Sequence, residues 1–449
     1  MALAASPTFS LTPSPEPQVL ATNYITDFDF LKTELPDTYS ENFERYGNRT
    51  IASFLRASSA EYPCTSDLIK WTEEGRLHTQ YTDVSRAVGT NTFTKTGHNF
   101  RKRQTIIISD GSVVEKALIT DVPDVNTFTA VSFLSGGFTH ATASATLKVY
   151  VYGSEFGKGT NGMEGALEAV PEFFENNPII IKDKYEVNGS DMTQIGWVEV
   201  STEGGGSGYL WYLKSEHETR LRFEDYLEMS MVEGVPAEAG SDAAAVANGT
   251  KGLFHEVGSR GNLFNGVASA QADFDNILKR LDKQGSIMEN MFFADRDQNL
   301  AIDDFLASKN SYGAGGTSYG AFNNQEKMAL NLGFYGFHRG SYEFYKTDWK
   351  YLNDASTRGN IDGTGKVRGL IVPSGTKTVY DQILGKKIRQ PFLHVKYRKS
   401  ATEDRRYKTW LTGSAGGASN SDLDAMQVQF LSERALVVIG ANNFLLIED

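Results

Sequence analysis

The sequence of 449 residues contains a single cysteine, few prolines and no long apolar run. Cys64 alone cannot form a disulfide within the chain, and it excludes a zinc site built from several cysteines. Twelve prolines against 43 glycines indicate that glycine makes the bends and that no proline-rich linker separates independent domains. No stretch approaches about 18 consecutive apolar residues, so we expect no membrane-spanning helix.

Positive charge is also scarce, because 44 Lys and Arg stand against 56 Asp and Glu, for a net charge of −12. Such a chain is a poor candidate for binding phosphate backbones over its whole surface, and only the cluster Arg101, Lys102 and Arg103 leaves room for a local basic patch. The first charged residue is Glu16, which argues against a secretory signal. With 40% hydrophobic residues, we expect a folded core shared by about three lobes.

Residues 1–60 have the composition of an arm. A small, polar, proline-containing start is followed by the apolar side chains of Tyr24 to Leu31. Apolar side chains with no evident local partner predict docking elsewhere, on the body of the chain or on a neighbouring copy. The alternative is a frayed terminus.

Residues 76–200 predict an almost wholly β region. Short β-branched and aromatic runs alternate with Gly, Asp and Asn turns at a spacing of roughly 10–20 residues, which is typical of a small antiparallel barrel or sandwich. Ile179–Val187 is a longer strand, and we expect it to pair with residues 76–83 across the barrel.

Two amphipathic helices follow. Residues 211–233 carry one apolar stripe and a Glu216–Arg220 pair at the i,i+4 spacing, and Gly234 ends the pattern. In residues 273–294 the apolar side chains recur at the helical period, although Gly285 interrupts them at a cost of about 1 kcal/mol relative to alanine. These side chains are Phe274, Ile277, Leu278, Leu281, Met288, Met291 and Phe292.

Residues 295–425 mix a short helix at 324–332 with strands at 342–345 and 369–372, so the fold class we predict is α+β. The chain closes with residues 428–439, a turn at 440–443 and residues 444–447, which predict a terminal β-hairpin.

Motifs for chemistry are incomplete. Gly157–Gly162 matches G-x-G-x-x-G, but too few residues precede Pro171 for the helix that a dinucleotide site needs, so we interpret it as a turn. Asp295-x-Asp297-x-Asn299 begins like an EF-hand loop and lacks its glycine and its final glutamate, which favours a surface turn. The seven histidines are scattered. We therefore predict no catalytic residue, no metal site and no cofactor, and a structural protein instead of an enzyme.

The order of these elements resembles the major capsid proteins of tailed bacteriophages, which have the Hong Kong 97-type capsid fold. Residues 178–200 resemble the returning strand of that family's extended loop, and residues 220–234 resemble the end of its spine helix. Later segments are similar as well, namely residues 249–257, 366–375 and 430–448.

The resemblance implies a role for each part of the chain. These are an N-terminal arm (1–60), an extended loop (61–208) bearing an inserted β-domain at about 90–155, a spine helix (209–234), a glycine-rich loop with the peripheral-domain helix (235–294), an axial domain (295–425) and terminal strands returning to the peripheral domain (426–449). Since the inserted β-domain is longer than a bare extended loop, it departs from the minimal pattern of the family.

The function that the resemblance implies is self-assembly into the hexamers and pentamers of an icosahedral phage head around double-stranded DNA. The partners would be other copies of the chain, with scaffolding, portal and decoration proteins, DNA enclosed without sequence-specific binding, and no membrane. The protein would be made in the bacterial cytoplasm and reside in the virion. Our candidate contacts between subunits are Phe28, Phe30, Tyr81, Arg101, Lys102, Arg103, Lys182 and Tyr185.

Two other functions remain open from the sequence. The aromatic, glycine-rich β content also fits another virion or surface module, such as a tail, baseplate or adhesin protein, although the two helices argue against a fibre. An enzyme built on Gly157–Gly162 is the third candidate, and nucleotide-dependent thermal stabilisation would reveal it.

Overall fold

A computed structural model describes most of the chain from Phe54 onward. The described residues are 54–55, 60–87, 89–138, 146–168, 171–192, 200–201, 207–208, 211–285, 287–309, 336–374, 376–381 and 386–449. The predicted arm contacts Phe28 and Phe30 and the predicted helix at 324–332 lie outside them. The chain divides into two compact units, one comprising residues 1–49, 184–220 and 411–428 and the other comprising the remainder.

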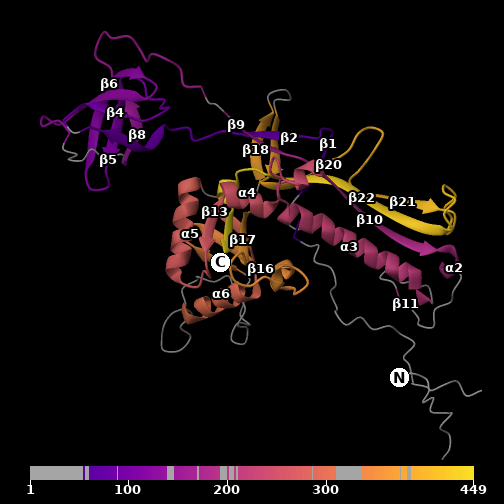
Figure 1. The fold of residues 1–449 in the computed structure, drawn as a ribbon. Helices are drawn as coiled ribbons and strands as arrows, with labels where there is room; N and C mark the ends of the chain where they lie inside the picture. The colour runs from indigo at the N-terminus through magenta and orange to yellow at the C-terminus, as the bar shows by residue number, and fades with distance from the viewer. Residues whose placement is uncertain are drawn as a thin grey trace, which may run out of the picture. The chain divides into compact units, whose positions relative to one another are not determined.

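The β-rich region forms a closed barrel of six strands in the order β3-β4-β7-β6-β5-β8 (Figure 1). This confirms the α+β class and the expected small barrel. Its interior is apolar because alternate residues of each strand point inward, and Phe93, Ile106, Ile119 and Phe128 are fully buried there. The strands are β3 (Gln80–Arg86), β4 (Thr92–Thr94), β5 (Gln104–Ser109), β6 (Val114–Asp124), β7 (Thr127–Ser132) and β8 (Leu147–Ser154).

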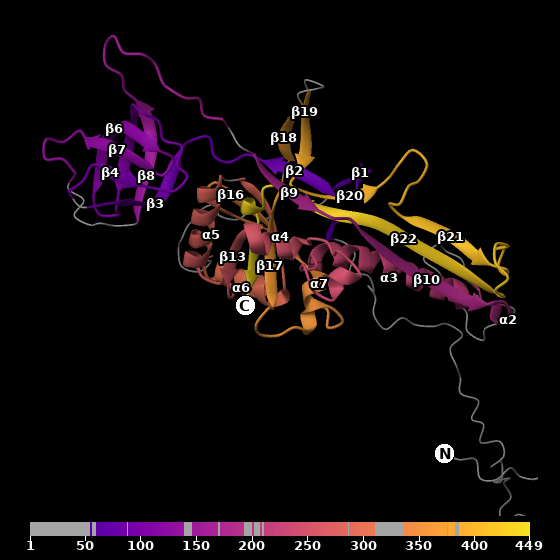
Figure 2. The same ribbon diagram turned by 45° about the horizontal axis from the view of Figure 1, so that its top comes forward.

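The chain enters and leaves the barrel region through a two-stranded ribbon. β2 (Ile69–Glu73) pairs antiparallel with β9 (Glu172–Asn176), so the two ends of the excursion lie side by side (Figure 2). The predicted pairing of Ile179–Val187 with residues 76–83 is wrong. The strand β10 (Ile179–Asn188) instead ends the sheet ordered β1-β20-β22-β10, because Ile179 and Ile181 pack on the core of the body.

That sheet is completed by strands from both ends of the described chain. β1 pairs parallel with β20, and β20 pairs antiparallel with β22, to which β21 also pairs. A separate ribbon joins β18 (Thr376–Asp381) to β19 (Lys386–Pro391) (Figure 2). The other strands are β1 (Ala60–Cys64), β20 (Leu393–Arg398), β21 (Lys408–Gly413) and β22 (Ala425–Val438).

A six-stranded sheet in the order β13-β23-β17-β14-β16-β15 forms the centre of the second unit. One face packs on α5 and α6, and the other packs on α4, α7 and the last turns of α3 (Figure 1). The strands are β13 (Asn262–Asn265), β14 (Glu289–Ala294), β15 (Gly336–Arg339), β16 (Tyr342–Asp348), β17 (Val367–Pro373) and β23 (Leu445–Glu448). The helices are α4 (Leu253–Arg260), α5 (Gln271–Gln284), α6 (Arg296–Lys309) and α7 (Lys350–Asn353).

The helix predicted at 211–233 is α3 (Trp211–Glu233), which confirms both of its ends. Phe223, Leu227 and Met231 form its buried stripe, whereas Tyr226 is 40% exposed. The Glu216–Arg220 ion pair is present at 3.6 Å. Three short elements precede this helix in the chain, namely α2 (Gly189–Met192), β11 (Val200–Ser201) and β12 (Ser207–Gly208).

Two predictions, for residues 273–294 and for residues 428–447, are wrong. The helix expected at 273–294 stops at Gln284, because Gly285 adopts a left-handed conformation (φ 89°) and caps it, and residues 289–294 form β14. The terminal hairpin does not form either. β22 and β23 belong to different sheets, and the left-handed Gly440 (φ 62°) redirects the chain between them.

Candidate assembly surfaces

The described residues contain no group of His, Cys, Asp and Glu side chains arranged to hold a metal ion. Gly157–Gly162 lies in a loop after β8, where the Thr160 hydroxyl donates to the Gly157 carbonyl at 2.7 Å, and residues 163–168 are not helical. Asp295 is buried, and its carboxylate accepts the backbone N–H of Gln298 at 2.7 Å, so it caps α6. Our expectation of an exposed turn at Asp295 was therefore wrong.

No helix among the described residues is both long enough and apolar enough to cross a membrane.

The root of the barrel excursion is fixed by Glu73, at the end of β2. Its Oε1 accepts hydrogen bonds from the Arg260 guanidinium at 3.3 Å and from the backbone N–H of Gly440 at 3.0 Å. Arg260 also pairs with Glu256 at 2.5 Å and donates to the Val438 carbonyl at 2.9 Å. Because these side chains are mostly buried, this charged cluster fastens the ribbon to α4 and β22.

Asn176 fixes the other strand of the ribbon. It is 2% exposed, and its amide donates to the carbonyls of Lys251 and Leu436 at 2.9 and 2.7 Å. Its oxygen accepts the Thr250 hydroxyl at 3.1 Å and the backbone N–H of Lys251 at 2.8 Å. One buried amide thereby joins β9, the loop before α4 and β22.

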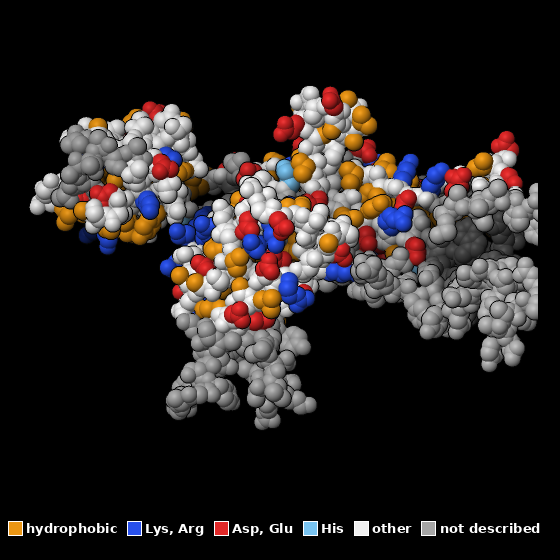
Figure 3. All heavy atoms as spheres, turned by 60° about the horizontal axis from the view of Figure 1, so that its bottom comes forward, with side chains coloured by type: hydrophobic (Ala, Val, Ile, Leu, Met, Phe, Trp, Pro, Cys, Tyr) orange, Lys and Arg blue, Asp and Glu red, His pale blue; other side chains and the backbone are white. Residues whose placement is uncertain are grey.

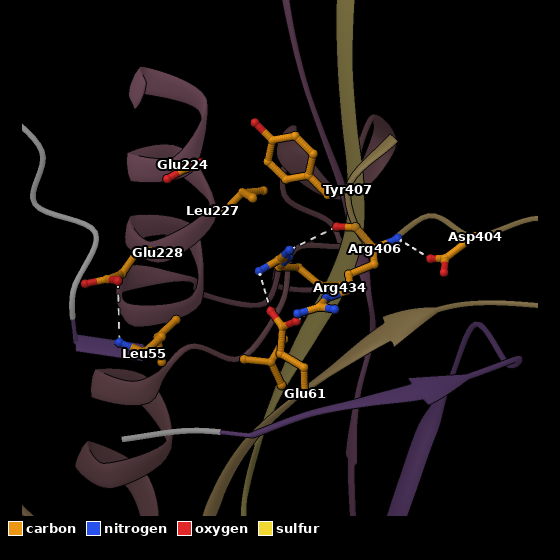
Figure 4. A pocket seen from close by; sticks show the side chains of 10 residues that line it. Leu55, Glu61, Glu224, Leu227, Glu228, Asp404, Arg406, Tyr407 and Arg434 are labelled. Atoms are coloured by element: carbon orange, nitrogen blue, oxygen red, sulfur yellow. Dashed lines mark hydrogen bonds and ion pairs between the residues drawn. The ribbon is translucent and has the colours of Figure 1, made fainter. Parts of the chain in front are cut away.

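A cavity of about 810 Å³ lies between α3 and the sheet that contains β20 and β22 (Figure 4). Arg434 lies at its wall, where burial lowers the pKa of its guanidinium, and it contacts Glu61 at 3.4 Å and the Arg406 carbonyl at 3.0 Å. The ten lining residues are Leu55, Glu61, Glu224, Leu227, Glu228, Val395, Asp404, Arg406, Tyr407 and Arg434.

Glu228 connects this cavity to the end of the predicted arm. Its buried carboxylate accepts the backbone N–H groups of Phe54 at 3.0 Å and Leu55 at 3.4 Å, which lie more than 170 positions earlier in the chain. Phe54 is itself fully buried against Phe293 and Trp349. The point where the arm region joins the body is thus anchored on α3.

The predicted contact residues of the barrel have different environments. Tyr81 packs against Phe100, and its hydroxyl accepts the backbone N–H of Asn99 at 2.8 Å, so its main contacts are within the barrel. Lys102 is exposed and pairs with Asp121 at 2.8 Å. The two arginines beside Lys102 differ as well, because Arg101 donates to the Gly165 carbonyl at 2.9 Å, whereas Arg103 has an exposed side chain and a left-handed backbone (φ 68°).

The two predicted residues of β10 point to opposite faces of its sheet. Lys182 lies on the exposed face, and Tyr185 lies on the covered face with Ile181 and Val187. Whether these side chains contact a second subunit stays a prediction. No sequence pattern predicts the roles of Glu73, Asn176 and Glu228, because each bonds to residues at least 70 positions away.

No protein-family model matches the chain, and no curated protein matches its sequence. Solved structures match over most of the chain. A structure from Gordonia phage Cozz is 10% identical, with a TM-score of 0.41 and coverage of 97% of this chain and 98% of its own. A structure from Mycobacterium phage Ogopogo is 9% identical, with a TM-score of 0.41 and coverage of 95% and 100%.

A structure described as the capsid of an empty GTA particle is 7% identical, with a TM-score of 0.40 and coverage of 92% of this chain and 95% of its own. The printed sources of these three structures are thus two phages and the capsid of an empty GTA particle.

Proposed function

We propose that the protein is a structural subunit that assembles into the hexamers and pentamers of an icosahedral phage head enclosing double-stranded DNA. The observation that carries this proposal is the exposure of large apolar side chains on ordered strands and their connections. Phe173 on β9 is 70% exposed, Ile180 on β10 is 53% exposed, and Leu77 between β2 and β3 is 91% exposed. Such side chains gain burial when copies of the chain associate.

The energetics favour association on a large scale. Obligate interfaces bury several thousand Å², and heterologous contacts close into rings when the rotation between copies permits. Burying 1,000 Å² of apolar surface contributes roughly 25 kcal/mol before the cost of ordering is subtracted. A subunit of this kind needs no catalytic residue, only complementary surfaces.

In this proposal the segments take the roles that the resemblance implies. Residues 1–60 are the arm, residues 61–208 the extended loop with the barrel, and residues 209–234 the spine helix. Residues 235–294 and 426–449 contribute to the peripheral domain, and residues 295–425 form the axial domain. The barrel adds a contact that a bare extended loop lacks.

The net charge of −12 supports a container that does not bind its cargo tightly. Within the basic cluster, Lys102 is already neutralised by Asp121. We therefore propose that DNA is enclosed without sequence-specific contacts, and that scaffolding, portal and decoration proteins act on the finished or growing shell.

Electron microscopy of the expressed full-length protein tests the proposal. We expect closed shells of uniform diameter, alone or with the cognate scaffolding protein. Light scattering that shows only monomers under all assembly conditions, with and without that scaffold, would contradict it.

A truncation lacking residues 1–40 tests the role of the arm. The body should keep its circular dichroism spectrum and cooperative unfolding, because Phe54 and Leu55 remain anchored on Glu228. Shell formation should be lost. Normal shells from the truncated protein would refute an arm that bonds between copies.

A further inference from the structure

The outside of the barrel carries an apolar face across four neighbouring strands. Inward-pointing residues such as Ile106, Ile108 and Ile119 fill the core. The alternate residues point outward, where a solvated sheet is ordinarily polar. Here they form a surface that we call the outer face, made of Ile107, Leu118, Val131, Tyr150 and Tyr152.

Strand register makes this surface continuous. Leu118 on β6 lies opposite Val131 on β7, and Ile107 on β5 lies opposite Tyr150 on β8. Directly opposed residues have their Cβ atoms about 5 Å apart, so these pairs touch. The Lys116 ammonium lies 5.8 Å from the centre of the Tyr152 ring, and Lys148 lies on the same exposed face of β8 as Tyr150 and Tyr152.

The outer face is accessible to a partner. Val131 is 38% exposed, Tyr150 is 45% exposed and Tyr152 is 48% exposed, and Phe133 next to β7 is 51% exposed. In Figure 3, hydrophobic side chains are visible along the lower edge of the barrel. Exposed tyrosines within an apolar patch are typical of protein interfaces.

Charge indicates which partner fits. Residues 76–171 contain nine Lys and Arg and eight Asp and Glu, which gives this region a net charge of +1. Because the whole chain has a net charge of −12, the remaining residues together carry −13. Contact between two bodies of this chain is opposed by like charge. A barrel that approaches the body of another copy meets no such repulsion. The positive side chains of Lys116 and Arg103 are attracted to the negative charge of that body.

We propose that the outer face of the barrel binds the acidic body of a second copy of this chain. This inference rests on the proposed self-assembly and names a surface for it. The contact is heterologous, since a barrel surface meets a different surface on the neighbour.

Photo-crosslinking of the full-length protein identifies the partner directly. We replace Tyr150 with p-benzoylphenylalanine, irradiate the protein under assembly conditions and map the crosslinked peptides by mass spectrometry, using a mixture of isotopically light and heavy chains. Crosslinks between light and heavy chains that join position 150 to residues 177–449 support the proposal. Crosslinks confined to one chain, or to a different virion protein, overturn it.

A matched pair of variants tests the energetic role. Val131→Lys places a charge in the outer face, and Val125→Lys places the same charge in a barrel turn where the side chain is 67% exposed. Both should melt like the wild type, since both sites are exposed. We expect V131K to reduce the yield of oligomers by at least about tenfold and V125K to leave it within about twofold. Equal yields for the two variants overturn the proposal.

The readouts separate this inference from the proposed function. If the wild-type protein forms no closed shells, the proposed function as a phage head subunit is refuted. Sedimentation velocity then decides the barrel contact. Wild-type oligomers that are lost in V131K and kept in V125K would still support that contact. Wild-type protein that sediments only as a monomer overturns both.

Discussion

The Arg260 guanidinium lies 4.0 Å from the centre of the Phe174 ring, so a side chain of α4 covers the ribbon that leads to the barrel. The same guanidinium pairs with Glu73 from the opposite strand of that ribbon at 3.3 Å. One cation therefore holds both strands at the place where the excursion leaves the body.

Arg260→Ala should lower the free energy of unfolding by about 2–4 kcal/mol, because it leaves the mostly buried carboxylates of Glu73 and Glu256 without their cation. Urea denaturation measures this change. Lys70→Ala is the control on the same ribbon, where the ion pair to Glu175 is half-exposed and should contribute less than about 1 kcal/mol. If the two variants lost the same free energy of unfolding, the buried cluster would contribute no more to stability than the exposed ion pair.

Asn176→Ala should lower the free energy of unfolding by about 2–3 kcal/mol, because it removes the hydrogen-bond partner of the buried Leu436 carbonyl and of the Lys251 backbone N–H. Thermal unfolding followed by circular dichroism gives the comparison. Asn177→Ala, at a half-buried neighbour, should change stability by less than half as much. A melting temperature for N176A that equals that of N177A would contradict the network.

His394 predicts a pH dependence of stability. Burial lowers its pKa to about 4 from an ordinary value of 6.5. Between these values the unfolded chain takes up a proton that the folded protein excludes, so stability present above pH 6.5 falls as the pH drops toward 4, by about 3 kcal/mol in total. Unfolding curves from pH 7 to 4 measure this loss.

The His394→Gln variant isolates that contribution from the carboxylates, which titrate in both proteins. The difference in stability between wild type and H394Q should shrink as the pH falls from 7 to 4. A constant difference over this range would mean that the folded protein protonates His394 normally.

Salt should promote assembly, because copies with a net charge of −12 repel one another. Yield measured by light scattering should rise between low and moderate ionic strength and with divalent cations. A yield that falls steadily with added salt would point instead to dominant attraction by the basic cluster at Arg101, Lys102 and Arg103.

Local patterns in the sequence predicted elements where one feature dominated. α3 matched because a single apolar stripe runs up to Gly234, whose backbone leaves the helix. The barrel matched because its strands alternate strictly between a filled interior and the outside. The strands predicted at 342–345 and 369–372 are confirmed as β16 and β17, because both segments are short runs rich in β-branched or aromatic residues.

Patterns failed where tertiary contacts decided. Met291 and Phe292 continue a helical period, yet β14 is a central strand buried on both faces, where Phe292 and Phe293 enter opposite cores. The terminal hairpin failed because each strand finds a better partner far away, Leu445 opposite Ile371 and Leu436 opposite Val395. Glu73, Asn176 and Glu228 were missed because their partners are remote in the chain.

The antiparallel pairing of Ile69–Glu73 with Glu172–Asn176 also makes the barrel modular. Both connections leave the body at neighbouring points, so a short turn can join Glu73 to Glu172 without stretching the backbone. Evolution or an engineer can therefore exchange the whole excursion for another domain while the remaining subunit keeps its own fold.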